Sequence, residues 1–311
     1  MKVLVTGGAG YLGTELVDRL NRRDDVREVV VYDNLSRPNY NLFTVSGPSP
    51  LTKVKFVRGD VLDSRGLRNV LRDIEVVYHL AARVSTPYSD ESAHLYEQVN
   101  HWGTAELVTA VEESGASMFI FLSSAAVYGF SDAQVMPSTP PNPKTFYGSA
   151  KLRAEQQVHR LSDKIETIIV RCANVYGYSR SIRFDAVINR FMFSAHVAEP
   201  MIVHGSGRQI RSFVSVENTA KCLEYLLDAP NPGAARDLVD RTMSIVDLTC
   251  AISSVYPNAE TLFVSQHVEP RHVKLSPAVS LGADLRVLPG DLTDELRNMA
   301  SRFATGARGA H

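Results

Sequence analysis

The sequence predicts an α/β protein built on a doubly wound parallel sheet, with a smaller mixed α/β domain after it. The first observation is an alternation of short apolar strands with helical segments, which continues as far as residues 165–170. The second is a glycine-rich turn between the first strand and the first helix, where such sheets bind dinucleotides. After Arg171 the alternation is lost. We expect the two domains to be a dinucleotide-binding one, residues 1–175 with residues 212–240 returning to it, and a substrate-binding one, residues 176–211 and 241–311.

The N-terminal unit carries the pattern of a dinucleotide site. Residues 1–6 form an apolar strand, the loop after it has glycines at positions 7, 10 and 13, and residues 14–21 have a helical pattern. Glycines at this spacing allow a tight turn, a close approach of the backbone to a pyrophosphate, and close packing of helix on strand.

Two acids follow later strands of the same unit. Asp33 ends a strand at residues 29–32, where a carboxylate accepts from the ribose hydroxyls of an adenosine and repels a 2′-phosphate. This favours NAD over NADP, although Arg37 weakens the preference, and a simple turn residue is the alternative for Asp33. Asp60 follows a strand at residues 54–58 and is placed either to accept from an adenine amino group or to serve near a helix N-terminus.

The next strand and helix hold two polar residues. His79 ends a strand at residues 75–79, and we expect it to be a packed, hydrogen-bonded core histidine rather than a catalytic one. The small residues after it let the strand end lie against a dinucleotide. Asn100 lies in a helical segment at residues 89–113 and needs a polar partner, so we expect it to brace the active-site strand through a water.

The catalytic pattern lies in the middle of the chain. A buried strand at residues 118–122 delivers Ser124 to its carboxyl end, and Tyr147 and Lys151 are one turn apart on a helix expected at residues 147–161. We expect the lysine to lower the pKa of the tyrosine and to hold a sugar hydroxyl. The tyrosine then takes a proton from an alcohol whose oxygen the serine steadies, and this oxidation needs a hydride acceptor. An ordinary amphipathic helix is the alternative, which the dinucleotide pattern around it makes the weaker one.

The second half is less regular. Beyond Arg171 we expect a helix at residues 183–196, a turn running into a strand within residues 205–214, a strand within 233–239, and helices within 245–255 and 292–303; the tail 306–311 is expected to fray. The helices at residues 89–113 and 147–161 have apolar faces that we expect to pair across a two-fold axis in a homodimer.

Composition excludes several classes of partner. The 311 residues are 44% hydrophobic and 22% charged with a net charge of -1, which gives no electrostatic footprint for nucleic acid or an anionic membrane. No apolar run reaches the roughly 18 residues of a membrane span, and we expect no signal peptide. Cys172, Cys222 and Cys250 stand among apolar neighbours with no Cys-x-x-Cys pair, so we expect buried free thiols and a cytoplasmic protein, and we predict no metal site.

Taken together, the motifs resemble the extended short-chain dehydrogenase/reductase family, and within it the NAD-dependent nucleotide-sugar epimerase branch, similar to UDP-glucose 4-epimerase. The resemblance covers almost the whole chain. The matching motifs, in the family's order, are Gly7-Gly8-Ala9-Gly10-Tyr11-Leu12-Gly13, Asp33, Asp60-Val61, His79-Leu80-Ala81-Ala82, Asn100, Ser123-Ser124-Ala125, Tyr147-x-x-x-Lys151 and Arg171-x-x-Asn174-Val175-Tyr176-Gly177.

The resemblance implies a Rossmann-type fold and a role for each matching residue. It makes Ser124, Tyr147 and Lys151 the catalytic set, with Tyr147 as the base. It implies that NAD is held by Gly7, Gly10, Tyr11, Leu12, Gly13, Asp33, Asn34, Asp60, Val61, Leu80, Ala81, Ala82, Asn100, Tyr147 and Lys151. It implies that a nucleotide-diphosphate sugar is held by Ser85, Ser124, Ala125, Asn174, Arg211 and Arg271. The forked guanidinium group of arginine suits a diphosphate, and a structural ion pair is the alternative for both arginines.

Some positions depart from the family's pattern. Ala125 and Ala126 stand where the nucleotide-sugar 4,6-dehydratases have Asp-Glu, which disfavours water elimination because that reaction needs its own proton donor and acceptor. Further departures, all around the substrate, are Val84, Tyr178, Ser212 and Glu217-Asn218. They leave the sugar and the base of the nucleotide open.

The sequence therefore predicts an NAD-dependent epimerase of a nucleotide-diphosphate sugar, which oxidises C4 to a ketone and reduces it again on the opposite face. An NAD(P)H-dependent 4-ketoreductase or dehydrogenase is the alternative. A 4,6-dehydratase and a non-catalytic nucleotide-binding protein are weaker alternatives, the latter because a sensor has no need of an intact catalytic set.

Overall fold

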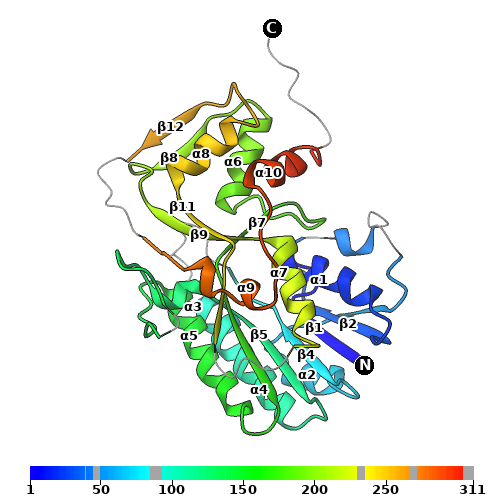
Figure 1. Ribbon diagram of the computed structural model, residues 1–311. Helices are drawn as coiled ribbons and strands as arrows, with labels where there is room; N and C mark the ends of the chain where they lie inside the picture. Colours follow the sequence, from blue (N-terminus) through cyan, green and yellow to red (C-terminus); the bar gives the residue numbers. More distant parts are fainter. Residues whose placement is uncertain are drawn as a thin grey trace.

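A parallel sheet runs through the larger lobe of the protein (Figure 1), in a computed structural model that describes residues 1–38, 40–44, 50–84, 93–136, 138–229, 235–265 and 272–303. Within these residues the sheet has seven strands in the order β10-β6-β5-β4-β1-β2-β3, and each neighbouring pair is parallel. The strands are β1 (Lys2–Thr6), β2 (Glu28–Asp33), β3 (Val54–Arg58), β4 (Val76–His79), β5 (Met118–Ser124), β6 (Glu166–Cys172) and β10 (Arg236–Leu238). The doubly wound sheet predicted from the sequence is confirmed.

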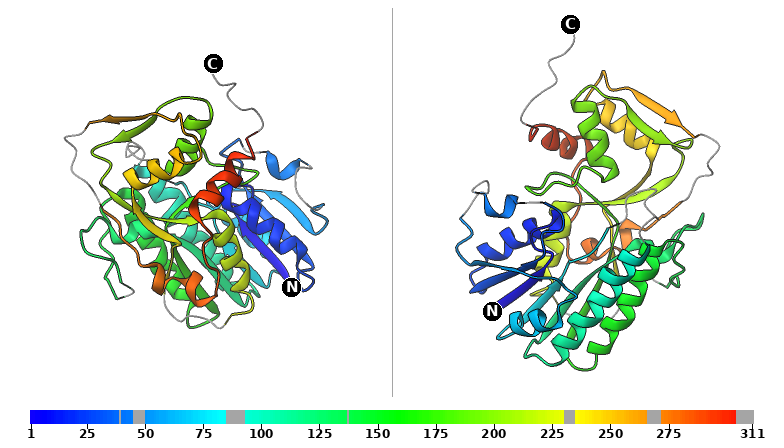
Figure 2. Two further views of the ribbon diagram at one scale, coloured as in Figure 1. Left: turned by 45° about the horizontal axis from the view of Figure 1, so that its top comes forward. Right: turned by 180° about the vertical axis from the view of Figure 1, so that it is seen from behind.

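Helices cover both faces of this sheet because successive strand side chains point to opposite sides. Val3 and Val5 pack with α1 (Tyr11–Arg22) and α7 (Val216–Tyr225), whereas Leu4 packs on the other face. That other face is covered by α2 (Ser64–Val70), α4 (Gly103–Glu112) and α5 (Phe146–Val158). Figure 2 shows α4 and α5 side by side when the molecule is seen from behind. Both faces of the parallel sheet are therefore buried under helices, as is usual for such sheets.

The smaller lobe, at the top of Figure 1, has its own core. A three-stranded sheet has the order β11-β9-β7 and a two-stranded sheet pairs β12 with β8. Their bounds are β7 (Asn174–Tyr176), β8 (Met201–His204), β9 (Ile210–Ser215), β11 (Arg241–Ser244) and β12 (Thr261–Val264). The helices are α6 (Val187–His196), α8 (Ile245–Ser253) and α10 (Leu292–Ala300). Phe191, Phe213 and Leu248 are buried between these elements.

Short helices connect the longer elements. They are η1 (Asn41–Phe43), α3 (Ala93–Tyr96), η4 (Ala125–Tyr128), η5 (His159–Leu161), η6 (Pro277–Val279), α9 (Leu281–Asp284) and the π-helical η3 (Glu97–Trp102). The chain crosses between the lobes more than once, because β7 follows β6, α7 follows β9, and β10 returns to the parallel sheet beside β6. The domain limits given above remain a prediction.

Three details differ from the sequence-based expectations. The helix expected at residues 183–196 begins only at Val187, because Ala186 is extended, with a ψ of 137°, and the residues before it form turns. Cys250 is exposed, whereas Cys172 and Cys222 are buried free thiols as expected. The first helix starts at Tyr11, within the glycine loop itself. Residues 89–92 and the tail 306–311 lie outside the described residues.

The part of the chain that the structure describes contains no helix long and apolar enough to cross a membrane.

Replacement of Gly13 by alanine tests the close packing of the glycine loop. A Cβ atom at Gly13 would lie 2.3 Å from the carbonyl oxygen of Gly7 and 2.6 Å from the Cα of Gly8, both backbone atoms. We expect Gly13→Ala to lower the free energy of unfolding by about 2–3 kcal/mol, measured by urea denaturation. Gly115→Ala is the matched control, because a Cβ there meets nothing within 4 Å, and its effect should stay within about 0.5 kcal/mol. Equal effects of the two substitutions would contradict this account.

Candidate active site

The catalytic residues predicted from the sequence meet at the carboxyl end of β5. Ser124 is the last residue of this strand, and its hydroxyl accepts from the N–H of Ala126 at 3.2 Å. Tyr147 and Lys151 lie on the first two turns of α5, a helix whose start is capped by Thr145. The hydroxyl of Ser124 acts on the phenol of Tyr147 and lowers its pKa. The strand and the helix thus place a serine, a tyrosine and a lysine at one edge of the sheet.

The expectation that Lys151 lowers the pKa of Tyr147 is wrong for this structure. Burial raises the pKa of Tyr147, and the hydrogen bond from Ser124 and the positive charge of Arg183 act in the opposite direction. The ammonium of Lys151 instead donates to the carbonyl oxygen of Leu122 at 2.8 Å. Sequence reasoning did not single out Arg183, because it lies in the turns before α6 that were expected to be helical.

Lys151 is an almost fully buried cation. Its side chain lies over the ring of Phe121, with the nitrogen 4.7 Å from the ring centre, and the residue is 2% exposed. Burial lowers its pKa from 10.5 to about 8, and the carboxylate of Glu155 acts against this change. Even so, the ammonium form is available at neutral pH, close to the point at which its proton is lost.

His79 is the packed core histidine that the sequence predicts. It is fully buried, with Nδ1 2.7 Å from the hydroxyl of Thr6 and Nε2 2.9 Å from the hydroxyl of Thr104. Burial lowers its pKa to about 3, helped by the charge of Lys151, so the ring stays neutral. Both nitrogens are engaged within the core.

The glycine loop lies where β1, α1 and the end of β4 meet. Gly7 has a φ of +71°, and a Cβ there would lie 2.6 Å from the backbone nitrogen of Ala81. No side chain caps the start of α1, where Gly10 is the N-cap residue. The first N–H groups and the positive end of this helix fit a pyrophosphate. The predicted cofactor residues Tyr11, Leu12, Leu80 and Ala82 belong to the same two segments.

The acids that were assigned to the adenosine come together beside this loop. Asp33 accepts from the N–H of Ala9 at 3.1 Å and from that of Leu35 at 2.8 Å, and burial raises its pKa. Asn34 donates to the carboxylate of Asp60 at 2.8 Å. The ends of β2 and β3 therefore present both carboxylates at the expected edge. The side-chain cap of α2 is Asp63, so Asp60 does not serve as that cap. The predicted Val61 follows Asp60 and is buried.

Asn100 has its polar partners in the backbone after β4. Both ends of its side chain bond the backbone of Arg83, each at 2.8 Å. It therefore fastens the segment after β4 to the π-helical turns of η3, and its expected action on the active-site strand through a water remains a prediction. The single extra residue per turn in a π-helix cannot be read from an apolar pattern with period 3.6.

Of the predicted substrate residues, Asn174 and Arg211 belong to strands of the smaller lobe, whereas Ser124 and Ala125 lie at the carboxyl end of β5. Asn174 opens β7 and donates to the carbonyl oxygen of Ser212 at 2.9 Å. Arg211 lies on β9, with its guanidinium 6.0 Å from the ring centre of Phe130. Ala125 is buried at the start of η4. Ser85 and Arg271 lie outside the described residues, and the role of the set in holding substrate remains a prediction.

A segment that the sequence analysis did not single out covers the glycine loop. We call residues 177–185 the strap. The hydroxyl of Ser179 donates to the carbonyl oxygen of Tyr11 at 2.9 Å, and that of Ser181 to the carbonyl oxygen of Ala9 at 3.3 Å. In return, the phenol of Tyr11 donates to the backbone of Gly177 at 2.6 Å.

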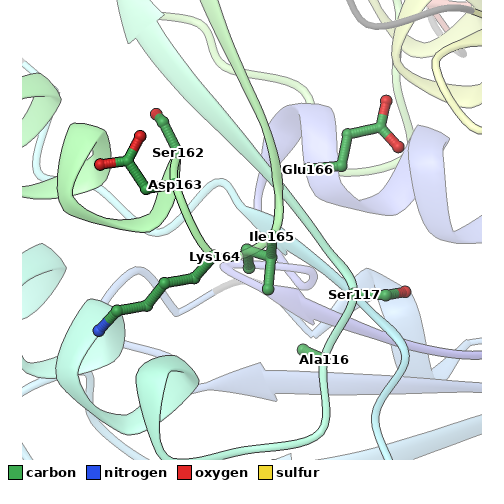
Figure 3. Close-up of a pocket in the computed structure, with 7 residues that line it drawn as sticks. All are labelled: Ala116, Ser117, Ser162, Asp163, Lys164, Ile165 and Glu166. Carbon is green, nitrogen blue, oxygen red and sulfur yellow. The ribbon is translucent and has the colours of Figure 1, made fainter.

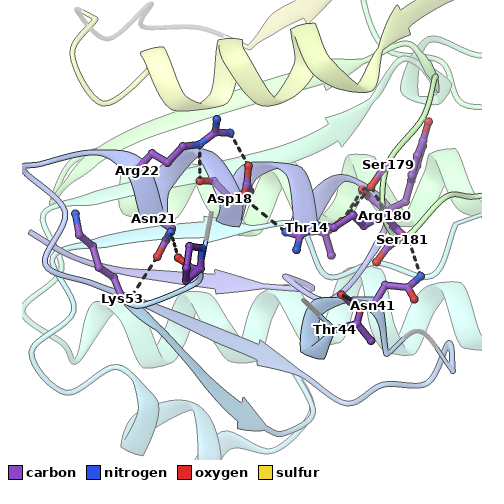
Figure 4. A network of polar contacts seen from close by, with 12 residues as sticks. Thr14, Asp18, Asn21, Arg22, Asn41, Thr44, Lys53, Ser179, Arg180 and Ser181 are labelled. Atoms are coloured by element: carbon purple, nitrogen blue, oxygen red, sulfur yellow. Dashed lines mark hydrogen bonds and ion pairs between the residues drawn. The ribbon is translucent and has the colours of Figure 1, made fainter. Parts of the chain in front are cut away.

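A second set of contacts fixes the strap to α1 and to the loop after β2 (Figure 4). The guanidinium of Arg180 lies 3.8 Å from the carboxylate of Asp18, and both side chains are buried. Asn41 donates to the carbonyl oxygen of Arg180, and Thr14 pairs with Ser179 at 3.0 Å. The strap is therefore bonded to both sides of the glycine loop.

The last residues of the strap form an ion-paired bridge. Asp185 accepts from Arg183 at 2.8 Å and from Arg37, in the loop after β2, at 3.3 Å. Interactions with Arg183 and Arg37 hold the pKa of Asp185 below its usual value against the effect of burial, which is the largest single influence. A hollow of about 450 Å³ lies here, lined by Tyr11, Arg37, Pro38, Ser181, Ile182, Phe184 and Asp185.

A larger hollow, about 660 Å³, lies elsewhere (Figure 3). Its lining residues are Ala116, Ser117, Ser162, Asp163, Lys164, Ile165 and Glu166. These precede or begin β5 and β6, so the hollow lies at the amino ends of strands whose carboxyl ends carry the catalytic residues. It is open, contains none of the predicted site residues, and is not the candidate active site.

The fold and the site together define a dinucleotide-dependent enzyme class with a serine, tyrosine and lysine set. The model of the NAD dependent epimerase/dehydratase family matches residues 3–239, and the chain belongs to this family. Membership brings NAD as the cofactor, and the residues present fit it: an uncapped helix start, a glycine in close contact with the neighbouring strand end, and a carboxylate beside the loop.

Known relatives include more than one activity. The chain is 31% identical to dTDP-D-glucose 4,6-dehydratase of Mus musculus over 255 residues, which is 79% of this chain and 70% of the relative. It is 32% identical to a putative UDP-glucose 4-epimerase of Methanocaldococcus jannaschii over 228 residues, 70% of this chain and 71% of the relative. The structure is similar to UDP-glucuronic acid 4-epimerase of Bacillus cereus in complex with UDP-glucuronic acid and NAD, with a TM-score of 0.83, 25% identity, and coverage of 97% of this chain and 98% of that one.

The stability of a Lys151→Met variant tests the burial of this cation. Because the folded-state pKa of about 8 lies below the ordinary 10.5, the cost of burying the ammonium is fully present below pH 8 and is lost by pH 10.5. The variant should therefore gain most over the wild type below pH 8. Its advantage in free energy of unfolding should shrink by up to roughly 3 kcal/mol between pH 8 and pH 10.5, measured by urea denaturation. Lys164→Met, at an exposed side chain, is the control. If the difference in free energy of unfolding between Lys151→Met and the wild type did not change with pH, the lowered pKa of Lys151 would be contradicted.

Proposed function

We propose that this protein is an NAD-dependent epimerase of a nucleotide-diphosphate sugar, acting by transient oxidation at C4 and reduction on the opposite face. The observation that carries the proposal is the placement of Ser124 at the end of β5 with Tyr147 and Lys151 on α5, where Lys151 is bonded to β5, in a fold whose glycine loop is suited to NAD. Bound NAD supplies the acceptor for the hydride and then its donor. The protein supplies the base, the bonds to the reacting oxygen and the enclosure.

Each catalytic side chain has one task in this mechanism. Tyr147 takes the proton of the sugar's 4-hydroxyl as the C4–H leaves as hydride, and it returns the proton to the oxygen when the ketone is reduced. Ser124 donates to the same oxygen and stabilises the charge that develops on it. Lys151 supplies a positive charge on the same helix, at a pKa that permits it to hold a proton near neutral pH.

A 4,6-dehydratase is the second candidate, because the dehydratase of Mus musculus is among the relatives at 31% identity. Elimination of water needs an additional proton donor and acceptor beyond Tyr147. Positions 125 and 126, directly after the catalytic serine, hold alanines, and Ala125 is buried. These two residues favour the epimerase over the dehydratase.

The strap favours a cofactor that is not exchanged at each turnover. An epimerase has no net redox change, so its NAD can remain bound, whereas a ketoreductase must release its oxidised cofactor every cycle. Two serine hydroxyls and the phenol of Tyr11 join the strap to the glycine loop, and the bridge from Asp185 to Arg37 extends this enclosure. This supports the epimerase over the reductase.

The first experiment offers purified protein a panel of UDP-, GDP-, CDP- and dTDP-sugars and follows the products by NMR. We expect a C4 epimer with no net change in NADH absorbance, and a loss of at least about 100-fold in kcat for Tyr147→Phe because the base is removed. Tyr225→Phe, at an exposed tyrosine on α7, is the control and should keep full activity.

Other products would reject the epimerase. A 4-keto-6-deoxy sugar would establish a dehydratase, and stoichiometric consumption of NAD(P)H with a 4-keto sugar would establish a reductase.

Retention of NAD can be measured without any substrate. In Asp185→Asn the bonds to Arg37 and Arg183 lose their charge, so we expect bound NAD to exchange with labelled NAD about tenfold faster than in the wild type. Glu113→Gln, which breaks an exposed ion pair with Arg68, is the control. Equal exchange rates in the wild type and Asp185→Asn would show that the bridge does not retain the cofactor.

A further inference from the structure

A buried polar network lies directly beneath the catalytic residues. The carboxylate of Glu155 accepts from the hydroxyl of Ser123 at 2.5 Å and from Arg171 through two bonds, at 3.0 and 2.7 Å. Glu155 is 1% exposed, Ser123 3% and Arg171 9%. Such a two-bond pair is geometrically specific as well as strong. None of these three side chains has a part in the mechanism above.

The network continues to the edge of the parallel sheet. Arg171 donates to the hydroxyl of Tyr128 at 2.9 Å, and this hydroxyl donates to the carboxylate of Asp237 at 2.9 Å. Burial raises the pKa of Asp237, which the bond from Tyr128 partly offsets. The network therefore joins β5, η4, α5, β6 and β10, and β5 and α5 are the two elements that carry the catalytic set.

Glu155 lies on the same helix as two of the catalytic residues. Tyr147, Lys151 and Glu155 follow one another at intervals of four residues, so they form one row along α5. Ser123, the residue that Glu155 holds, immediately precedes Ser124. One carboxylate thus bonds the strand end that carries the catalytic serine, and it belongs to the helix that carries the catalytic tyrosine and lysine.

The surroundings of Lys151 show what this carboxylate contributes. Four titratable groups face or adjoin the lysine: Tyr147 and Glu155 on α5, Cys172 at the end of β6, and His79 on β4. His79 stays neutral, and burial raises the pKa of the thiol of Cys172 to about 12. Glu155 is the carboxylate among these four groups, and its effect on the pKa of Lys151 opposes that of burial.

We propose that Glu155 is a positioning residue for the reaction, which fixes the catalytic end of β5 against α5 through Ser123 and supplies the negative charge that holds Lys151 in its ammonium form. This inference rests on the function proposed above for the kinetic role of Ser124, Tyr147 and Lys151. The electrostatic half does not depend on any substrate. A simple structural ion pair with Arg171 would need neither the bond to Ser123 nor the effect on Lys151.

The first test is an NMR titration of Lys151 in protein labelled with ¹³C at lysine Cε, assigned by the loss of its signal in Lys151→Met. In the wild type we expect a midpoint of about 8. In Glu155→Gln we expect the midpoint to fall by about one pH unit or more, because an opposite charge nearby has been removed. Glu112→Gln, which breaks the pairs with Arg160 and Lys164 at the surface, is the matched control and should leave the midpoint unchanged.

Removal of one partner from a buried ion pair can prevent folding, at a cost of about 3–5 kcal/mol. The double variant Glu155→Gln with Arg171→Gln removes both charges of this pair, and its Lys151 midpoint is compared with that of Arg171→Gln, which keeps the carboxylate. A Lys151 midpoint that is the same with and without the carboxylate in either folded comparison would overturn the electrostatic role.

The second test is kinetic and uses Ser123→Ala, which keeps the pair of Glu155 with Arg171 intact. We expect kcat to fall about tenfold with KM within about threefold of the wild type, because the reacting groups are misplaced while binding is retained. Unchanged kcat in this variant would overturn the positioning role. If the wild type epimerises none of the sugars, the proposed function fails, and the Lys151 titration still decides the role of Glu155.

Discussion

In a parallel sheet every strand delivers its carboxyl end to the same edge, and this constraint organises the whole molecule. The glycine loop follows β1, Asp33 ends β2, Asp60 follows β3, and Ser124 ends β5. The parallel sheet alone therefore brings groups from distant parts of the sequence to one edge. The strand order reverses between β1 and β4, and sheets of this kind bind their ligands at such a point. The smaller lobe faces this edge with β7 and β9.

Burial is the second determinant of the site. One row of α5 carries Tyr147, Lys151 and Glu155, beside the apolar core between this helix and the sheet. Each ionisable group in such surroundings needs a specific polar partner. Lys151 has the carbonyl oxygen of Leu122, Tyr147 has Ser124, and Glu155 has Arg171. These partners are local consequences of strand and helix register. Burial raises the pKa of Tyr147, and the effect of Ser124 only partly offsets this rise.

The sequence predicted the parts of the fold and site that depend on local pattern. The alternation of strands and helices, the glycine loop with Asp33, and the spacing of Tyr147 and Lys151 follow from periodicity and from short motifs, and the structure places them together. It did not predict the strap, because the bond from Tyr11 to Gly177 joins residues 166 positions apart and polar pairs leave no periodic signal. The same reason applies to Asn100, whose partner is a backbone segment. The start of α6 was missed because residues 183–186 have a helical composition but are held in turns by side chains.

The strap also has a consequence for how the protein acquires its cofactor. The glycine loop is made early in synthesis, and the strap that is bonded to it is made more than 160 residues later. The carbonyl oxygens of Ala9 and Tyr11 gain their serine partners only when these two parts of the chain have come together, so we expect movement of the strap and exchange of bound NAD to be coupled.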